Sequence, residues 1–523
     1  MFPLSDNQKK KIALLIEGDA WFDFETRTTY STATCLYKVM PLGVVAPKHA
    51  EDVSRIVRFC NKEGIALIPR GGATGLVGQA LGMGIILDFT KYMNAIVKIA
   101  DDLSTITTQP GCITATLNQT LAPHKKYYPI DPQSAKKCTI GGNIATNAAG
   151  PHGIKYGATK NEIRSATVVL SNGDAAQLFN NESNNILSPF GTSIVERTKN
   201  LLKHNQLLIQ ANVPKAVKFS SGYNIYEALR NDNLNMLRLL CGSEGTLAVV
   251  TEATFNMYDV PTESATFIAY FDSYEKTAEA TLLALEFSPD AIELLDKSYA
   301  EVGTGINETI DSFLGGEFQA MLAIQFEGQS KETVQSSAEN LLAVLKKKNL
   351  MLRHRQLFSH EEQNAVWELR EEVAAKLNTM PSVLRKTSII EDGAVPVAQL
   401  AKYLSGVQRI LTSYNIPFRL YGHAGTGNIH CSTYVAIETH EGQEKIECAA
   451  RDVFDLTIQL GGTLSGEHGD GYIRTPFLER AVGTDIYAIF KDVKNIFDPN
   501  NILNPNKIIG KQDGFFLHDI KYV

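Results

Sequence analysis

The sequence predicts an α+β protein built from several domain-sized units, as expected for 523 residues. From Val44 onward, segments with apolar residues at helical spacing alternate with short apolar strands. Three glycine-rich segments, at 69–78, 139–157 and 241–249, interrupt the first half of the chain. After Pro261 these loops stop, and strands alternate with helices as in a ferredoxin-like antiparallel sheet covered by helices.

Composition and charge exclude several classes of protein. Hydrophobic residues at 44% and charged residues at 20% are typical of a globular chain. The formal charge of −7, without a basic block, predicts no nucleic-acid partner. The sequence has no apolar run of about 18 residues, and its N-terminal lysines are misplaced for a secretory signal. We expect a cytoplasmic protein, one peripheral to the inner face of a membrane, or a mitochondrial-matrix protein if the source is eukaryotic.

The cysteines form no recognisable framework. There are seven, an odd number, and no C-x-x-C occurs. This usage predicts a reducing compartment, no disulfide network and no cysteine-ligated iron–sulfur cluster within the chain.

The first predicted unit begins with a helix over 50–63 that ends at Gly64. A buried strand follows at 65–69, and the first glycine loop leads into another strand at 84–89. A Rossmann dinucleotide site needs glycines that open a helix. This loop therefore predicts a different kind of phosphate cradle.

The following segments suggest how the chain is divided. The second glycine-rich segment precedes a predicted hairpin whose strands join at Asn172–Gly173, and the third enters a strand. We expect an N-terminal helical segment 1–37, a first domain 38–258, a cap domain 259–455 and a C-terminal segment 456–523.

Glycine-rich loops let backbone N–H groups converge on phosphate oxygens, because glycine permits close backbone approach. Taken singly, such a loop is more often only a tight turn. The ordered set PRGGATG, YPIDPQSAKKCTIGGNIATNAAG, KYG and GSEGTLAVVTEA is more specific. It resembles the FAD-binding domain of the vanillyl-alcohol-oxidase superfamily, the PCMH type. Over residues 38–510 the chain resembles the FAD-linked D-lactate, glycolate and D-2-hydroxyglutarate dehydrogenases.

This resemblance implies a two-part FAD-binding domain plus a cap domain, and it assigns residues to the cofactor. The first loop would bind the pyrophosphate, the second segment the ribityl chain and isoalloxazine, and the third the adenosine end. The loop GGATG lacks the histidine that some relatives attach to the flavin, which implies non-covalent FAD. The matching residues are Pro69, Arg70, Gly71, Gly72, Ala73, Thr74 and Gly75; Pro132, Ser134, Thr139, Gly142, Asn143 and Thr146; Glu244, Gly245 and Val249; and Asn504.

Two motifs concentrate the histidines, YGHAGTGNIHC and LSGEHGDGYIR. Two imidazoles and one carboxylate, His423, His430 and Glu467, could form the three-ligand set of an open catalytic metal site. The alternative is that these histidines merely cap glycine turns. The resemblance implies the metal site, with Thr426 standing where many relatives have aspartate. Zn²⁺ is favoured, and Mn²⁺ or another divalent ion suits the same ligands.

The resemblance also implies a general base and a carboxylate clamp. His468 matches the family's base, and an imidazole is suited to taking a hydroxyl proton at neutral pH. Arg370, in the predicted helix AVWELREEVAAKL, would grip a substrate carboxylate. The alternative for Arg370 is an exposed ion pair with Glu371 or Glu372. The further substrate candidates are Lys386, Asn428 and Arg474.

These features lead us to expect an enzyme that oxidises a D-2-hydroxy acid to a 2-keto acid. Ile390 stands where D-2-hydroxyglutarate dehydrogenases carry a lysine, which favours a D-lactate-like monocarboxylate over D-2-hydroxyglutarate. Electrons would leave to a quinone, an electron-transfer flavoprotein or a separate iron–sulfur subunit, and a homodimer is one expected assembly. The alternatives are a same-fold oxidase of another alcohol, a non-redox ether-lipid synthase, or a non-catalytic or partner-dependent flavin subunit of a respiratory complex.

Overall fold

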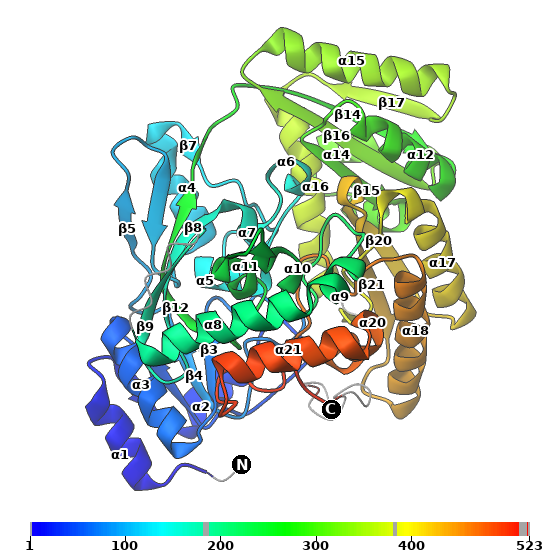
Figure 1. The fold of residues 1–523 in the computed structure, drawn as a ribbon. Helices are drawn as coiled ribbons and strands as arrows, with labels where there is room; N and C mark the ends of the chain where they lie inside the picture. The colour runs from blue at the N-terminus through cyan, green and yellow to red at the C-terminus, as the bar shows by residue number, and fades with distance from the viewer. Residues whose placement is uncertain (1–2, 181–187, 380–383, 512–519, 521–523) are drawn as a thin grey trace.

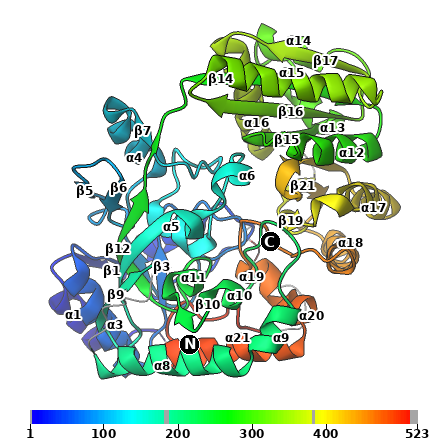
Figure 2. The same cartoon turned by 45° about the horizontal axis from the view of Figure 1, so that its top comes forward.

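The computed structural model describes residues 3–180, 188–379, 384–511 and 520 (Figure 1). In the described residues the first domain carries two larger sheets and two short two-stranded ones, and a cap domain with one large sheet lies beside it (Figure 2). None of the described helices is both long and apolar enough to cross a bilayer.

The first sheet has the strand order β1-β2-β4-β3. Its strands are β1 (Asp19–Trp21), β2 (Gly43–Ala46), β4 (Ile85–Asp88) and β3 (Leu67–Arg70), and all but β1 run parallel. The predicted helix is α3 (Ala50–Glu63), and Gly64 ends it in the left-handed conformation with φ of 65°. The N-terminal segment 1–37 holds α1 (Asp6–Leu15) and α2 (Phe24–Tyr30), and it supplies β1 to this sheet.

The second sheet is antiparallel, in the order β5-β6-β12-β8-β9. Its strands are β5 (Ile96–Ile99), β6 (Thr105–Thr108), β12 (Val249–Asn256), β8 (Ile163–Val169) and β9 (Ala175–Phe179). The predicted hairpin is confirmed as β8–β9. Side chains of β8 and β12 pack into the same core as α3, so the two sheets share their interior.

The cap sheet has eight strands in the order β17-β14-β16-β15-β20-β21-β18, with β19 paired to β21. The first four by sequence are β14 (Glu263–Phe271), β15 (Ala291–Asp296), β16 (Ala320–Gly328) and β17 (Arg353–Leu357). With α12 (Tyr274–Leu285) after β14 and α15 (Lys331–Lys347) after β16, they form the ferredoxin-like unit that the sequence predicts. The sheet is larger than predicted because β20 (Phe418–His423), β21 (Asn428–Val435), β18 (Arg385–Thr387) and β19 (Gly393–Ala394) extend it.

Helices cover both faces of the cap sheet. Strand alternation sends Phe267 and Phe271 of β14 toward α12 and α15, and Ile268 and Tyr270 toward the opposite face. That opposite face is covered by α13 (Lys297–Ala300), α14 (Glu308–Leu314) and α16 (His360–Thr379). On this face, Tyr421 and His423 of β20 and His430 of β21 line a cavity.

The chain returns to the first domain after α18 (His440–Gln459). There α21 (Thr484–Phe497) lies beside α8 (Pro189–His204) in both views (Figures 1 and 2). The backbone of Leu67 in β3 bonds to Ile502 at 2.7 Å and to Asn504 at 2.8 Å. The loop 465–470 lies in the chain between α18 of the cap and α21 of the first domain, and it is therefore found between the two domains.

The remaining elements connect these sheets. They are α4 (Thr114–Leu121), β7 (Lys126–Tyr127), α5 (Ile140–Thr146), α6 (Gly153–Tyr156), α7 (Thr159–Glu162), α9 (Gln206–Ala211), α10 (Ile225–Ala228), β10 (Leu229–Arg230), β11 (Asn233–Leu234), α11 (Met236–Leu240), β13 (Tyr258–Asp259), α17 (Leu400–Ser413), α19 (Gly471–Arg474), α20 (Leu478–Val482) and the short 3₁₀ turns at 122–124, 301–303, 397–399, 424–426 and 475–477.

Candidate active site

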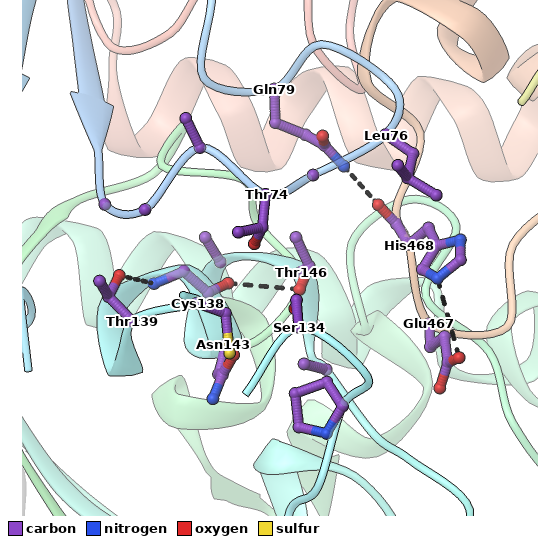
Figure 3. A pocket seen from close by; sticks show the side chains of 18 of the residues that line it. Thr74, Leu76, Gln79, Ser134, Cys138, Thr139, Asn143, Thr146, Glu467 and His468 are labelled. Carbon is purple, nitrogen blue, oxygen red and sulfur yellow. Dashed lines mark hydrogen bonds and ion pairs between the residues drawn. The ribbon is translucent and has the colours of Figure 1, made fainter. Parts of the chain in front are cut away.

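A cavity of about 490 Å³ joins the glycine-rich loops of the first domain to the histidines of the cap sheet. Figure 3 shows Thr139 and Asn143 at one end of this cavity and His468 with Glu467 at the other. A cofactor held by the loops and a substrate held by the histidines would therefore share one space.

The three glycine-rich segments are distant in sequence but form one wall, here called the glycine cradle (residues 69–75, 137–142 and 244–245). A Cβ on Gly72 would strike the carbonyl of Lys137, so the first two segments touch through their backbones. A Cβ on Gly245 would lie 3.2 Å from Cγ of Pro69, so the third segment closes against the first. Glycine alone leaves room for this approach, and the exposed backbone fits a phosphate-bearing cofactor such as FAD.

Most residues predicted to bind FAD lie on the cavity wall, but two do not. Val249 is buried in the core that the two sheets share, and its neighbour Val250 lines the cavity instead, because alternate strand residues face opposite sides. Asn504 lies behind the cradle, where its amide donates to the carbonyl of Glu244 at 2.7 Å. The predicted residues on the wall are Pro69, Arg70, Gly71, Gly72, Ala73, Thr74, Gly75, Pro132, Ser134, Thr139, Gly142, Asn143, Thr146, Glu244 and Gly245.

Glu244 connects the cradle to the loop that carries the catalytic candidates. Its carboxylate accepts the backbone N–H groups of Asp470 at 2.5 Å and Gly471 at 3.1 Å. Burial, together with the Asp470 carboxylate, raises the pKa of Glu244 to about 8. The hydrogen bonds from Asp470 and Gly471 to Glu244 hold this loop against the cradle, so the two ends of the cavity keep a fixed separation.

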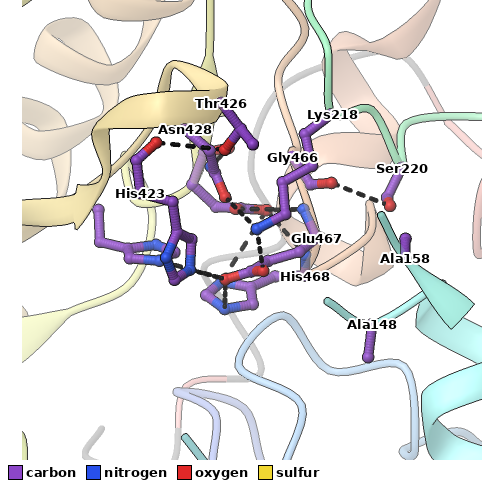
Figure 4. A network of polar contacts seen from close by, with 12 residues as sticks. Ala148, Ala158, Lys218, Ser220, His423, Thr426, Asn428, Gly466, Glu467 and His468 are labelled. Atoms are coloured by element: carbon purple, nitrogen blue, oxygen red, sulfur yellow. Dashed lines mark hydrogen bonds and ion pairs between the residues drawn. The ribbon is translucent and has the colours of Figure 1, made fainter. Parts of the chain in front are cut away.

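Three imidazoles and one carboxylate converge at the far end, and we call His423, His430, His468 and Glu467 the histidine–carboxylate cluster (Figure 4). Oε1 of Glu467 lies 3.0 Å from Nε2 of His423, 3.2 Å from Nε2 of His430 and 3.8 Å from Nε2 of His468. His423 ends β20 and His430 lies on the neighbouring β21, so strand pairing brings the two rings together.

Two carboxylates behind the histidines orient their rings. Nδ1 of His423 lies 2.6 Å from Glu293, and Nδ1 of His468 lies 3.1 Å from Glu391. Although burial opposes it, the charges of Arg370 and His423 lower the pKa of Glu293 to about 2. With Nδ1 of His423 engaged by this carboxylate, Nε2 is the ring nitrogen that points toward Glu467 and, in the neutral ring, could bind a metal.

The cluster fits a divalent metal. Nε2 of His423 and Nε2 of His430 lie 3.0 Å and 3.2 Å from the same oxygen of Glu467, and the carboxylate of Glu293 lies behind His423. Distance alone also groups Asp392 with His430, Glu467 and His468. Asp392, however, already accepts the backbone N–H groups of Glu467 at 3.2 Å and His468 at 2.8 Å. The Asp392 carboxylate is thus already engaged by the loop backbone, which leaves the imidazole nitrogens and Glu467 as the groups that could hold an ion.

His468 is the cluster member most open to the cavity, with 25% of its side chain exposed. Burial disfavours its charged form, but the carboxylates of Glu391 and Asp392 raise the pKa of His468 to about 9. The Gln79 side chain donates to the backbone carbonyl of His468 and so fixes the position of the loop. A cavity-facing imidazole backed by a carboxylate can exchange a proton with a bound substrate.

Arg370 reaches the same cavity from α16. Its Nε lies 2.7 Å from Oε2 of Glu293, and its carbonyl accepts the hydroxyl of Tyr299 at 2.9 Å. Arg370 is buried and does not form an exposed ion pair with Glu371, because Glu371 lies 3.1 Å from Lys136. Its guanidinium is thus placed to receive a substrate carboxylate.

The other substrate candidates differ in their access to the cavity. Lys386 lines it, from a strand paired with the strand of His430. Asn428 lies behind the cluster, where its amide donates to Asp392 at 2.9 Å. Arg474 is fully buried outside the cavity wall and donates to the carbonyl of Gly469 at 2.8 Å.

Ile390 does not face the cavity, contrary to its expected place beside the substrate. Its side chain is buried in the core that packs against α12, α15 and α17, on the other face of the cap sheet. The neighbouring Glu391 lines the cavity instead. The identity of residue 390 therefore says little about the size of the substrate.

Sequence reasoning missed three charged residues of this site, Lys218, Glu293 and Glu391. A signal existed for Glu293, because a carboxylate in the apolar strand AIELLD must find a partner when that strand is buried. Glu391 directly follows Ile390, the position that the resemblance compares with a lysine of D-2-hydroxyglutarate dehydrogenases. Lys218 has no local signal, since only the fold brings it to Glu467.

A glycine cradle that opens onto a buried histidine–carboxylate cluster defines a flavin-dependent oxidoreductase. Comparison with known proteins agrees, since residues 41–178 match "FAD binding domain" and residues 260–508 match "FAD linked oxidases, C-terminal domain". The chain is 31% identical over 516 residues to glycolate oxidase subunit GlcD of Bacillus subtilis, covering 96% of this chain and 97% of that protein. It therefore belongs to the FAD-linked oxidase family.

Other relatives extend this comparison. D-lactate dehydrogenase of Archaeoglobus fulgidus is 30% identical, covering 90% of this chain and 91% of that protein. D-2-hydroxyglutarate dehydrogenase of Escherichia coli is 27% identical over 94% of this chain, which spans 50% of that longer protein. Among solved structures, p-cresol methylhydroxylase matches with a TM-score of 0.70 at 14% identity, covering 97% of both chains. This likeness concerns the fold alone, and it confirms the predicted PCMH-type architecture.

Proposed function

We propose that this protein oxidises a D-2-hydroxy acid to the corresponding 2-keto acid. The observation that carries the proposal is the cavity shared by the glycine cradle, the histidine–carboxylate cluster and Arg370. In support, relatives at 27% to 31% identity are named for glycolate, D-lactate and D-2-hydroxyglutarate, all of which are 2-hydroxy acids.

Each residue at the cap end of the cavity has a role in this reaction. Arg370 binds the substrate carboxylate through two parallel N–H donors, with Glu293 holding the guanidinium in place. His468 in its neutral form accepts the hydroxyl proton, so the raised pKa of this imidazole predicts that flavin reduction accelerates as the pH rises toward 9. Glu391 holds the ring toward the cavity.

His423, His430 and Glu467 would hold a divalent metal, with Zn²⁺ favoured over Mn²⁺, and such an ion would lower the pKa of a substrate hydroxyl. FAD bound in the cradle supplies the acceptor for the hydride that leaves the substrate carbon.

The side chain of the substrate distinguishes two candidates. We propose a D-lactate-like monocarboxylate first, because Arg370 alone suffices to bind one carboxylate. D-2-hydroxyglutarate is the second candidate, because Lys386 offers another cation on the wall of the same cavity.

We also propose that electrons leave to an external acceptor. The relative from Bacillus subtilis is named as a subunit of glycolate oxidase, which supports a partner polypeptide as the acceptor or its binding platform. The acceptor classes expected from the sequence, a quinone, an electron-transfer flavoprotein or an iron–sulfur subunit, all fit this scheme.

Anaerobic single-turnover reduction of the purified flavoprotein tests the proposal. D-lactate, D-2-hydroxyglutarate, the L-enantiomers of these two acids and the achiral glycolate are each mixed with the enzyme, and loss of flavin absorbance is followed. A D-2-hydroxy acid should reduce the flavin and its L-enantiomer should not. Failure of every 2-hydroxy acid, with FAD and metal present, would favour a non-catalytic or partner-dependent subunit.

A further inference from the structure

Lys218 is a buried cation at the histidine–carboxylate cluster that has no role in the proposed reaction so far. Its side chain is only 5% exposed, and its ammonium donates to Oε2 of Glu467. It also donates to Oδ1 of Asn428 at 3.2 Å, and Figure 4 shows the ammonium between these two side chains.

This contact makes the two oxygens of Glu467 unequal. Oε1 faces Nε2 of His423 at 3.0 Å and Nε2 of His430 at 3.2 Å, whereas Oε2 faces Lys218. A carboxylate with one oxygen held by an ammonium can offer only the other oxygen to a cation beside the two imidazoles.

The backbone around Lys218 fixes its position. The N–H of Ser220 donates to the carbonyl of Ser465 at 2.9 Å, and the N–H of Gly222 donates to Asp470 at 2.6 Å. The segment 218–222 thus runs alongside the loop 465–470 that carries Glu467. Lys218 belongs to the first domain and Asn428 to the cap, so this ammonium is placed only when the two domains are assembled.

We propose that Lys218 is a positioning residue that restricts Glu467 to one-oxygen coordination of the metal and so preserves an open coordination position for the substrate. The proposal rests on the proposed function, because it requires a metal at His423, His430 and Glu467. The positive charge of Lys218 also repels the metal. The site therefore binds its metal less tightly than the three ligands alone would allow.

Lys218→Met tests this directly, since methionine is an unbranched side chain one atom shorter than lysine and lacks its charge and donors. Oε2 of Glu467 becomes available as a further ligand and the ammonium charge no longer repels the metal. Metal affinity, measured by competition with a chelator, should therefore rise by at least ~10-fold. The apparent dissociation constant of D-lactate, or of whichever D-2-hydroxy acid reduces the parent flavin, should rise by at least ~10-fold in anaerobic flavin reduction. A crystal structure of the zinc-loaded variant should show both oxygens of Glu467 on the metal.

Two further variants act as controls. Lys218→Arg retains the positive charge and the donors, so it should not raise metal affinity. Lys160→Met removes another buried lysine of the same domain, one that pairs with Glu227 at 3.0 Å, and should leave metal affinity unchanged. If Lys218→Met does not fold, Lys218→Gln also removes the charge and should likewise bind metal more tightly.

The outcomes separate this proposal from the proposed function. A parent protein that binds no divalent metal overturns both the metal site and the role of Lys218. A parent that binds metal, together with neutral Lys218 variants of equal or weaker metal affinity, overturns the role of Lys218 and leaves the metal site standing. If Lys218 only stabilised the fold, its neutral variants would bind metal with equal or weaker affinity than the parent.

Discussion

The glycine cradle is made of backbone from three loops, whereas the histidine–carboxylate cluster is made of ionisable side chains from β20, β21 and one interdomain loop. In the cradle, room for a cofactor depends on the absence of a side chain, as at Gly72 beside the carbonyl of Lys137. In the cluster, the geometry depends on contacts between ionisable groups, since Glu467 contacts both Lys218 and His423. Substitutions in the cradle should therefore lower FAD occupancy, and substitutions in the cluster should slow flavin reduction while FAD stays bound.

The largest expected effect is loss of FAD from Gly72→Trp. The new side chain would occupy the space where the first two cradle segments meet, so the purified protein should be colourless. FAD released by acid precipitation measures occupancy. Gly315→Ala is the matched control, because a Cβ there meets nothing within 4 Å. Full FAD occupancy in Gly72→Trp would show that the cradle is misassigned.

His468→Asn should separate chemistry from cofactor binding. The variant should keep FAD and metal, because His468 belongs to neither binding set, while flavin reduction slows ~100- to 10,000-fold, the usual range for losing a general base. Single-turnover reduction alongside elemental analysis measures both properties. His440→Asn, at an 83% exposed position, is the control. Reduction of the variant at the parent rate contradicts the base assignment.

His423→Ala should separate the metal from the flavin. Loss of a supporting contact alone costs a metal site ~10- to 100-fold in affinity, so loss of a ligand should cost at least ~100-fold. Metal content and flavin-reduction rate should fall together while FAD stays bound, and a chelator should reproduce the effect in the parent. Metal content that is unchanged in His423→Ala would remove this histidine from the ligand set.

The smallest expected effect is that of Arg370→Met. A hydrogen bond to a charged group contributes about 1.5–3 kcal/mol, so the substrate dissociation constant should rise ~10- to 100-fold. The concentration dependence of flavin reduction measures it, and exposed Glu368→Gln on the same helix is the control. Unchanged substrate affinity would assign the carboxylate contact to another cation, with Lys386 the first to test.

Local sequence determined much of the architecture. The helix at 50–63, the hairpin at Asn172–Gly173 and the ferredoxin-like unit after Pro261 follow from periodicity and turn residues, which act over a few residues of chain. The cradle segments could also be recognised, because glycine at a close backbone approach leaves a mark in the sequence itself.

Only the tertiary structure decided how the charges pair. Strand alternation turned Val249 into the core, and the turn between β18 and β19 directed Ile390 away from the cavity, although both stand in segments that reach it. Glu293 comes to His423 through the pairing of β15 with β20, and Lys218 comes to Glu467 across 249 residues of chain. A buried charge is selected by the partner that it meets after folding, and sequence spacing carries no record of that partner.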